Sequence, residues 1–112
     1  MSHNLSIGNK TLPLDKDGYL RNLEDWDREV AHTLALQEGI SLTKKHWEII
    51  HLLRDFHHTH GLSPIMRVLV KLVKKEYGLE KGNSQYLLGL FPGNPATLAS
   101  KIAGLPRPTN CL

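Results

Sequence analysis

The chain has 112 residues, a length that fits one compact domain able to bury a hydrophobic core without disulfide or metal staples. Hydrophobic residues make up 40% and charged residues 22%, so an intrinsically disordered chain is excluded. The formal net charge of +3 comes from mixed basic and acidic residues and supports nucleic acid binding only weakly. The sequence contains no apolar run of the ~18 residues that a bilayer-spanning helix requires.

The chain contains a single cysteine, Cys111, which excludes an intramolecular disulfide and a fold that depends on an oxidising compartment. The first residues, Met1 to Leu5, lack the basic and apolar blocks of a signal peptide. We therefore expect a cytoplasmic protein.

The first twenty residues have the pattern of strands and turns. Leu5 and Ile7 alternate with polar residues, and Leu12 and Leu14 repeat the alternation after a Gly-Asn turn signal at 8–9. An Asp-Gly pair at 17–18 marks a second turn. This pattern predicts an N-terminal antiparallel β-hairpin.

The rest of the chain to residue 103 shows helical periodicity. Glycines or prolines separate segments in which apolar residues recur every three or four positions. We predict about five helices, with these bounds: from 22–25 to Gly39, from Ser41 or Thr43 to Gly61, from Ser63-Pro64 to Gly78, 82–91 and 96–103. The fold class is therefore α+β and mainly helical, a hairpin followed by a compact helical bundle.

Two details of these helices are specific enough to be tested. Trp26, Val30 and Leu34 should lie on the apolar side of the first helix. Ser63 and Pro64 have the residue types of an N-cap and first helical position, so they should begin the third helix.

The last nine residues, 104–112, cannot form a helix or a central strand because Pro106 and Pro108 lack backbone donors and fix their own φ. We predict a domain at 1–103 and a mobile arm at 104–112, with Gly104 as hinge candidate. Near the end of the arm, Cys111 is a candidate reactive thiol. Lys101 and Arg107 are the charged residues between 101 and 112, and such a basic setting favours the thiolate.

Seven histidines raise the possibility of a metal site, since three of them lie at 57, 58 and 60. On a helix, His57 and His60 share a face, but two ligands are fewer than the three or four that zinc needs. The glycines follow helix ends and form no phosphate-binding loop. We expect neither a metal nor a cofactor.

A helix-turn-helix-like part is compatible with residues 63–77 followed by 82–91. Lys71, Lys74, Lys75 and Lys81 would then face phosphates. The second of these helices carries no arginine to read guanine, so DNA binding by a regulator is one alternative, and a basic docking surface for a protein or RNA-bearing partner is another.

Short sequence motifs throughout the chain resemble the DsrC/TusE family of small sulfur-relay proteins. The most specific are Lys81-Gly82-Asn83-Ser84 and the tail from Gly104 to Cys111. Others include Asp17-Gly18-Tyr19-Leu20, Glu24-Asp25-Trp26, His46-Trp47-Glu48, Leu53-Arg54-Asp55-Phe56, Leu90-Phe91-Pro92 and Ile102-Ala103. The resemblance implies a cytoplasmic sulfurtransferase in which Cys111 holds a persulfide and which works only with partner proteins. Lys81, Lys101 and Arg107 are expected to support the thiolate or dock those partners.

The resemblance also points to the family type with a single arm cysteine. Members that serve dissimilatory sulfite reductase have a second cysteine eleven positions earlier, where this chain has Ser100. The single-cysteine pattern is similar to the TusE-like type, which implies a TusBCD- or DsrEFH-like donor complex and an MnmA-like tRNA thiouridylase as acceptor. A carrier in sulfur oxidation or sulfite reductase-linked metabolism remains the alternative.

Overall fold

The computed structural model describes residues 3–108, which begin with the predicted hairpin. Strands β1 (His3–Ile7) and β2 (Lys10–Leu14) pair antiparallel, and the two-residue turn at 8–9 joins them. Gly8 has a φ of 57°, a value that glycine adopts without strain and that tight hairpin turns require. The predicted hairpin is confirmed.

Within the described residues, five α-helices follow the hairpin, as predicted. They are α1 (Arg28–Gln37), α2 (Lys44–His60), α3 (Met66–Tyr77), α4 (Ser84–Leu90) and α5 (Pro95–Ile102). Local caps explain several of their ends: Asn83 accepts a hydrogen bond from the N–H of Tyr86 at the start of α4, and Gly61 takes a left-handed conformation after α2. None of these helices is long and apolar enough to cross a membrane.

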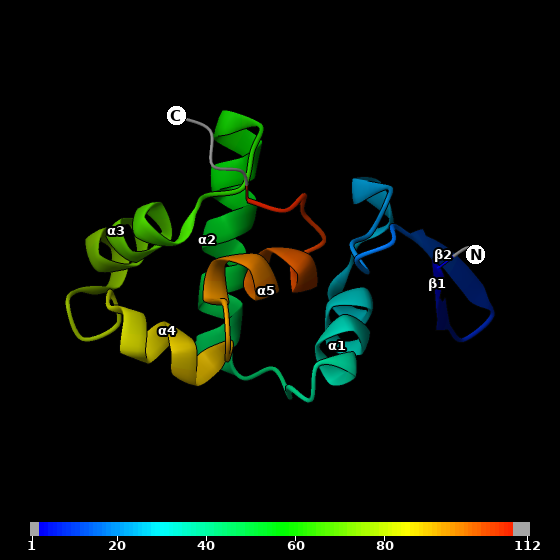
Figure 1. Cartoon of the computed structure of the whole chain (residues 1–112), viewed down its shortest axis with the longest axis horizontal. Coiled ribbons are helices and arrows are strands. Elements are labelled where there is room, and N and C mark those ends of the chain that lie inside the picture. The colour runs from blue at the N-terminus through cyan, green and yellow to red at the C-terminus, as the bar shows by residue number, and fades with distance from the viewer. Residues whose placement is uncertain (1–2, 109–112) are drawn as a thin grey trace.

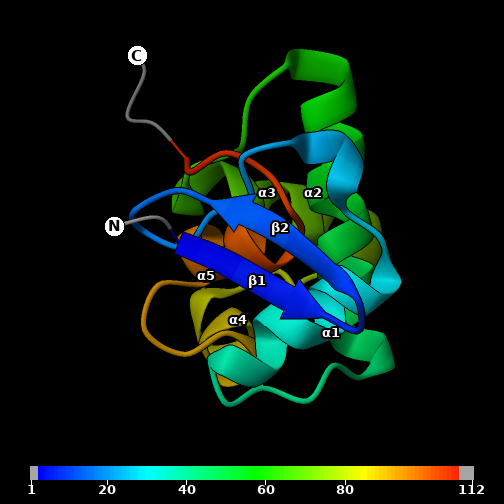
Figure 2. The same ribbon diagram turned by 90° about the vertical axis from the view of Figure 1, so that its right-hand side faces the viewer.

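Helix α5 lies at the centre of the molecule and packs against α1, α2, α3 and α4 (Figure 1). Its small residues Ala96 and Ala99 are buried, which allows the neighbouring helices to approach closely. The hairpin covers one end of the molecule beside α1, and α3 and α4 form the other end (Figures 1 and 2). The carboxyl end of α5, where the predicted arm begins, therefore emerges from the middle of the fold.

The first helix begins later than predicted. A short 3-10 turn occupies Leu23–Asp25, and α1 starts at Arg28 because the Asp27 carboxylate caps it, accepting a hydrogen bond from the N–H of Val30 at 2.9 Å. Trp26 thus precedes the helix, and its placement on the apolar side of α1 was wrong. Its indole turns toward α5 and donates to the Ile102 carbonyl at 2.9 Å.

The predicted start of α3 was also wrong. The helix begins at Met66, two residues after Pro64, and Ile65 precedes it without a side-chain cap. Ser63 does not cap because its hydroxyl donates instead to the Pro106 carbonyl at 2.6 Å. The local pattern assigned this side chain to the helix end, but it binds a residue 43 positions away in the sequence.

Candidate functional site

The chain turns sharply where it leaves α5. Gly104 has a φ of 72°, and the N–H of Leu105 donates to the Ser100 carbonyl at 3.0 Å. Leu105 is only 2% exposed and belongs to the core. We call residues 103–108 the arm root, since they lead into the C-terminal residues.

Side chains from α2 and from the loop between α2 and α3 bind the start of the arm root. Arg54 in α2 donates to the Ala103 carbonyl at 2.6 Å, and its guanidinium lies 3.9 Å from the ring centroid of Trp26. Ser63 binds the Pro106 carbonyl as described above. These contacts satisfy backbone carbonyls that follow the end of α5, so they fix the path of the chain there.

Gly104 therefore lies in a packed position and not at an open hinge. A Cβ atom at this position would lie 2.3 Å from Cδ1 of Trp26, a distance that no side chain tolerates. Residues 104–105 are packed against the folded body. The expected division into a domain at 1–103 and an arm at 104–112 stays a prediction, and so does mobility of the chain beyond residue 105.

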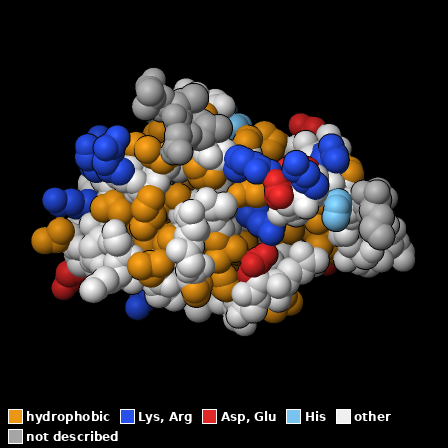
Figure 3. Space-filling view, viewed as in Figure 1, with side chains coloured by type: hydrophobic (Ala, Val, Ile, Leu, Met, Phe, Trp, Pro, Cys, Tyr) orange, Lys and Arg blue, Asp and Glu red, His pale blue; other side chains and the backbone are white. Residues whose placement is uncertain are grey.

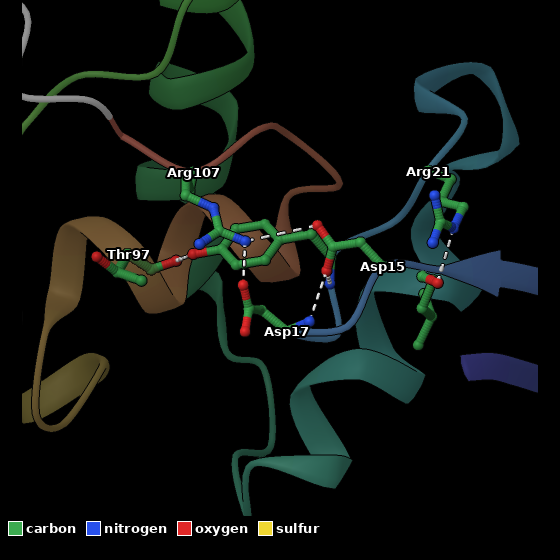
Figure 4. A network of polar contacts seen from close by, with 7 residues as sticks. Asp15, Asp17, Arg21, Thr97 and Arg107 are labelled. Atoms are coloured by element: carbon green, nitrogen blue, oxygen red, sulfur yellow. Dashed lines mark hydrogen bonds and ion pairs between the residues drawn. The ribbon is translucent and has the colours of Figure 1, made fainter. Parts of the chain in front are cut away.

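Arg107 is held by the turn that follows the hairpin (Figure 4). Its guanidinium forms an ion pair and hydrogen bond with the Asp17 carboxylate and lies 3.6 Å from Oδ2 of Asp15. It also lies 5.0 Å from the ring centroid of Tyr19, whose hydroxyl donates to the Thr97 carbonyl of α5 at 3.4 Å. We call Asp15, Asp17, Tyr19 and Arg107 the Arg107 clamp.

The surroundings shift the pKa values of three members of the clamp, Asp15, Tyr19 and Arg107. Burial alone would raise the pKa of Asp15, but backbone N–H groups of Tyr19 and Asp17 and the charges of Arg107 and Arg21 together lower it. The hydrogen bond to Asp17 and the charge of its carboxylate raise the pKa of Arg107. Burial raises the pKa of Tyr19, which stays neutral.

The other two predicted cations are also paired with carboxylates. Lys101 binds Glu38 at 3.0 Å, and Lys81 binds Glu48 at 2.9 Å. No acidic residue lies between 101 and 112 in the sequence. In the folded protein, however, acidic side chains from distant segments face Lys101 and Arg107. Lys81 lies near α2 and α3, so the structure does not bring it together with the arm root.

An open cleft of about 490 Å³ lies beside the arm root. It is lined by residues of the turn that follows the hairpin, the α4–α5 loop, α5 and the arm root, among them Tyr19, Asn94, Lys101, Arg107 and Pro108. A second cleft, to which Arg107 also contributes, is lined by Asp15, Leu20, Leu23 and Pro106. Arg107 therefore borders two clefts, in a region where Figure 3 shows basic and acidic side chains close together.

Cys111, the predicted sulfur-bearing residue, lies outside the described residues. No group of three or more histidine, aspartate or glutamate side chains at 3–108 is placed to hold a metal ion. In that same range the lysines at 71, 74 and 75 are exposed on α3, a face that suits any acidic partner and does not specify DNA.

Comparisons with known proteins agree on one family. The family model described as DsrC like protein matches residues 6–112. The sulfurtransferase TusE of Yersinia pestis is 47% identical over 108 residues, covering 96% of this chain and 99% of that protein. The chain belongs to the DsrC-like family. This confirms the predicted family, and the predicted sulfurtransferase activity agrees with the name of that relative.

Solved structures of the DsrC-like family have the same fold. DsrC from Allochromatium vinosum superimposes with a TM-score of 0.91 at 45% identity, covering 100% of both chains. The oxidised DsrC, or gamma-subunit of the dissimilatory sulfite reductase, from Archaeoglobus fulgidus gives a TM-score of 0.84 at 44% identity, over 98% of this chain and 100% of that one. The hairpin and five helices are therefore a DsrC-like fold.

Ser100, where the family comparison suggested a departure, is buried in α5. Its side chain has no exposed surface, and its hydroxyl has no hydrogen-bond partner among residues 3–108. A buried hydroxyl is normally paired, so nothing in the described structure requires an oxygen at this position.

Sequence reasoning missed most side chains that hold the arm root: Asp15, Asp17, Trp26, Arg54 and Ser63. Each lies in a segment whose local pattern already explained it as a turn, cap or helix residue. Three of them, Asp17, Trp26 and Arg54, occur in the motifs that carried the family resemblance, which was the available signal that they have a role beyond a local turn or helix.

Proposed function

We propose that this DsrC-like protein is a sulfurtransferase of the tRNA 2-thiouridine relay and that it carries sulfane sulfur as a persulfide on Cys111. The main support is the family match, which extends over the entire C-terminal tail, together with the presence of one cysteine in the chain. A relay needs one thiol because sulfur arrives and leaves by the same exchange reaction.

The chemistry needs no external oxidant. The Cys111 thiolate attacks the outer sulfur of a donor persulfide, the donor S–S bond breaks, and the donor leaves as a thiolate. Cys111 then bears the S–SH group. In the second step an acceptor cysteine thiolate attacks that outer sulfur, the S–S bond at Cys111 breaks, and Cys111 returns to the thiolate.

The arm root supports this proposal because it fixes the point on the folded body from which the chain leads to Cys111. Cys111 lies three residues beyond Pro108, and extended chain covers at most ~3.3–3.6 Å per residue, so its Cα stays within roughly 11 Å of that of Pro108. A partner must therefore bring its own reactive sulfur within the reach that this length of chain allows from Pro108.

We propose a donor complex of the TusBCD or DsrEFH type and an acceptor of the MnmA type, with tRNA involved only through the acceptor. Lys101 and Arg107 are proposed to act in positioning and docking more than in activating the thiolate, because Glu38 and the two aspartates already offset their charges. Lys81 is proposed as a docking residue at a separate surface.

The loading step can be tested by intact-mass spectrometry. Wild type and Cys111→Ser are incubated with a small-molecule persulfide and then with reductant. We expect wild type alone to gain about one sulfur, roughly 32 Da, and to lose it on reduction. No gain in wild type with several competent donors, or an equal gain in Cys111→Ser, would contradict the proposal.

A second candidate function is a DsrC-like carrier in sulfur oxidation or sulfite reductase-linked metabolism. The observation that favours it is the likeness to the gamma-subunit of the dissimilatory sulfite reductase from Archaeoglobus fulgidus, which at 44% identity is nearly as similar as the relative from Yersinia pestis. The two functions share the loading step and differ in the acceptor, so only a delivery assay separates them.

A further inference from the structure

We infer that Asp17, supported by Asp15, is a positioning residue that controls how far Cys111 can reach, by holding or releasing Arg107. The inference rests on the proposed function, since it takes Cys111 to be the carrier. It assigns a role to a turn that lies some 90 residues before Arg107 in the sequence.

Hydrogen bonds within the turn at 15–19 fix its shape independently of Arg107. Oδ1 of Asp15 accepts the N–H groups of Asp17 and Tyr19, each at 2.9 Å, and the N–H of Asp15 donates to the Tyr19 carbonyl at 2.7 Å. The N–H of Gly18 closes the turn on the Asp15 carbonyl at 3.0 Å. Asp15 thus shapes the turn, whereas the Asp17 carboxylate has one side-chain partner among residues 3–108, which is Arg107.

The Arg107 clamp holds the chain less firmly than the contacts at the start of the arm root do. Leu105 is 2% exposed and its N–H is bonded, so residues up to 105 stay with the body. The Arg107 side chain is 50% exposed and that of Asp17 42%, and ion pairs at such positions are weak because water and salt compete for them. Ser63 also holds the Pro106 carbonyl at 2.6 Å, so the arm root has a firm part ending at Pro106 and a releasable part that begins at Arg107.

Release of the clamp changes the radius available to the thiol. With Arg107 held, four residue steps lead from it to Cys111, a reach of roughly 14 Å for fully extended chain. With Arg107 released and the Pro106 carbonyl still bound by Ser63, five steps lead from Pro106 to Cys111, a reach of roughly 18 Å. A closed clamp suits partners whose reactive sulfur is exposed, and an open clamp is needed to enter a recessed site.

The test uses a nitroxide attached to Cys111 in the full-length chain, with broadening of backbone amide signals as readout. In wild type at low salt we expect broadening to concentrate around the two clefts beside Arg107. Asp17→Asn should extend broadening to amides farther away, and high salt should do the same in wild type. Glu38→Gln is the matched control, because it removes the Lys101 pair at the same cleft without touching Arg107.

A charge exchange separates positioning from a merely structural role. Asp17→Arg combined with Arg107→Asp should restore the wild-type pattern that either single change loses. In sulfur transfer to a protein acceptor with a recessed thiol, Asp17→Asn should lower KM by about two- to fivefold, the factor expected for losing one weak ion pair. Its loading by a small-molecule persulfide should not change.

Identical broadening in wild type and Asp17→Asn, or no recovery in the exchanged pair, would overturn the inference. Failure of the proposed function has a different signature, because wild type would then take up no sulfur while the broadening experiment still reported the clamp. The two failures are therefore distinguishable.

Discussion

Gly104 shows how one residue links the core to the arm root. Its left-handed backbone turns the chain at the end of α5, and its missing side chain makes room for the indole of Trp26. Both requirements fall on the same position, so glycine is needed there for two independent reasons. Its presence in the family-like tail is explained by packing as well as by conformation.

Gly104→Ala should therefore destabilise the protein by at least about 2 kcal/mol, from the positive φ together with the overlap with Trp26. Chemical denaturation measures the loss. The matched control is Gly89→Ala in α4, where a Cβ has no neighbour within 4 Å and φ is ordinary. That change should stabilise the protein by roughly 0.5–1 kcal/mol through helix propensity. Equal effects of the two changes would show that position 104 is not packed as described.

His46 is the clearest case at the scale of an element, because it joins two helices. At the start of α2, its Nδ1 accepts the N–H of Thr43 at 3.0 Å, which leaves the proton on Nε2. Nε2 donates to the Leu90 carbonyl at the end of α4, at 2.9 Å. The neutral ring thus completes a capping box and ties α4 to α2.

This arrangement predicts a pH-dependent stability. Burial lowers the pKa of His46, and the hydrogen bond to Leu90 offsets this only in part. As the pH falls below about 6.5, the unfolded chain takes up a proton that the folded chain resists, so the free energy of unfolding decreases. The contribution is fully present above pH ~7 and is lost on acidification.

His46→Gln tests this, because glutamine at the same position can keep the capping box but does not titrate. Its free energy of unfolding should change less between pH 7 and 5 than that of wild type. Measurements at pH 8, where both side chains are neutral, give the separate cost of losing the bond to Leu90. A pH dependence as steep as that of wild type would assign the titration to another group.

At the same scale, local patterns predicted helix ends only where the cap was local. Thr43 lies three residues from its partner His46, and α2 begins directly after Thr43, one of the two predicted starts. Ser63 has the right residue type for a cap, but its hydroxyl binds Pro106, so the start of α3 was wrong. Apolar periodicity predicts a helix whatever the tertiary contacts are, whereas the partner of a single hydroxyl depends on residues far away in the sequence.

At the scale of the whole molecule, the same limit applies to the candidate site. The order of elements followed from apolar spacing and glycine positions, and the family-like tail pointed to Cys111. The surroundings of the arm root could not be predicted because they depend on how the hairpin, α1 and α2 pack around α5. That packing brings in Asp15, Asp17, Glu38 and Arg54. Counting charges along the tail therefore predicted a basic setting around Lys101 and Arg107, whereas acidic side chains lie against both residues.

The most direct test of the proposed relay function is to follow delivery of the carried sulfur to tRNA. The protein is loaded with sulfur-34, freed from excess donor, and mixed in a single turnover with an MnmA-type thiouridylase, ATP and unmodified tRNA. We predict that sulfur-34 appears in 2-thiouridine at the rate at which it leaves Cys111, and that Cys111→Ser delivers none. Loaded protein that keeps its sulfur, or that loses it without labelling the tRNA, would contradict the assignment to the thiouridine relay.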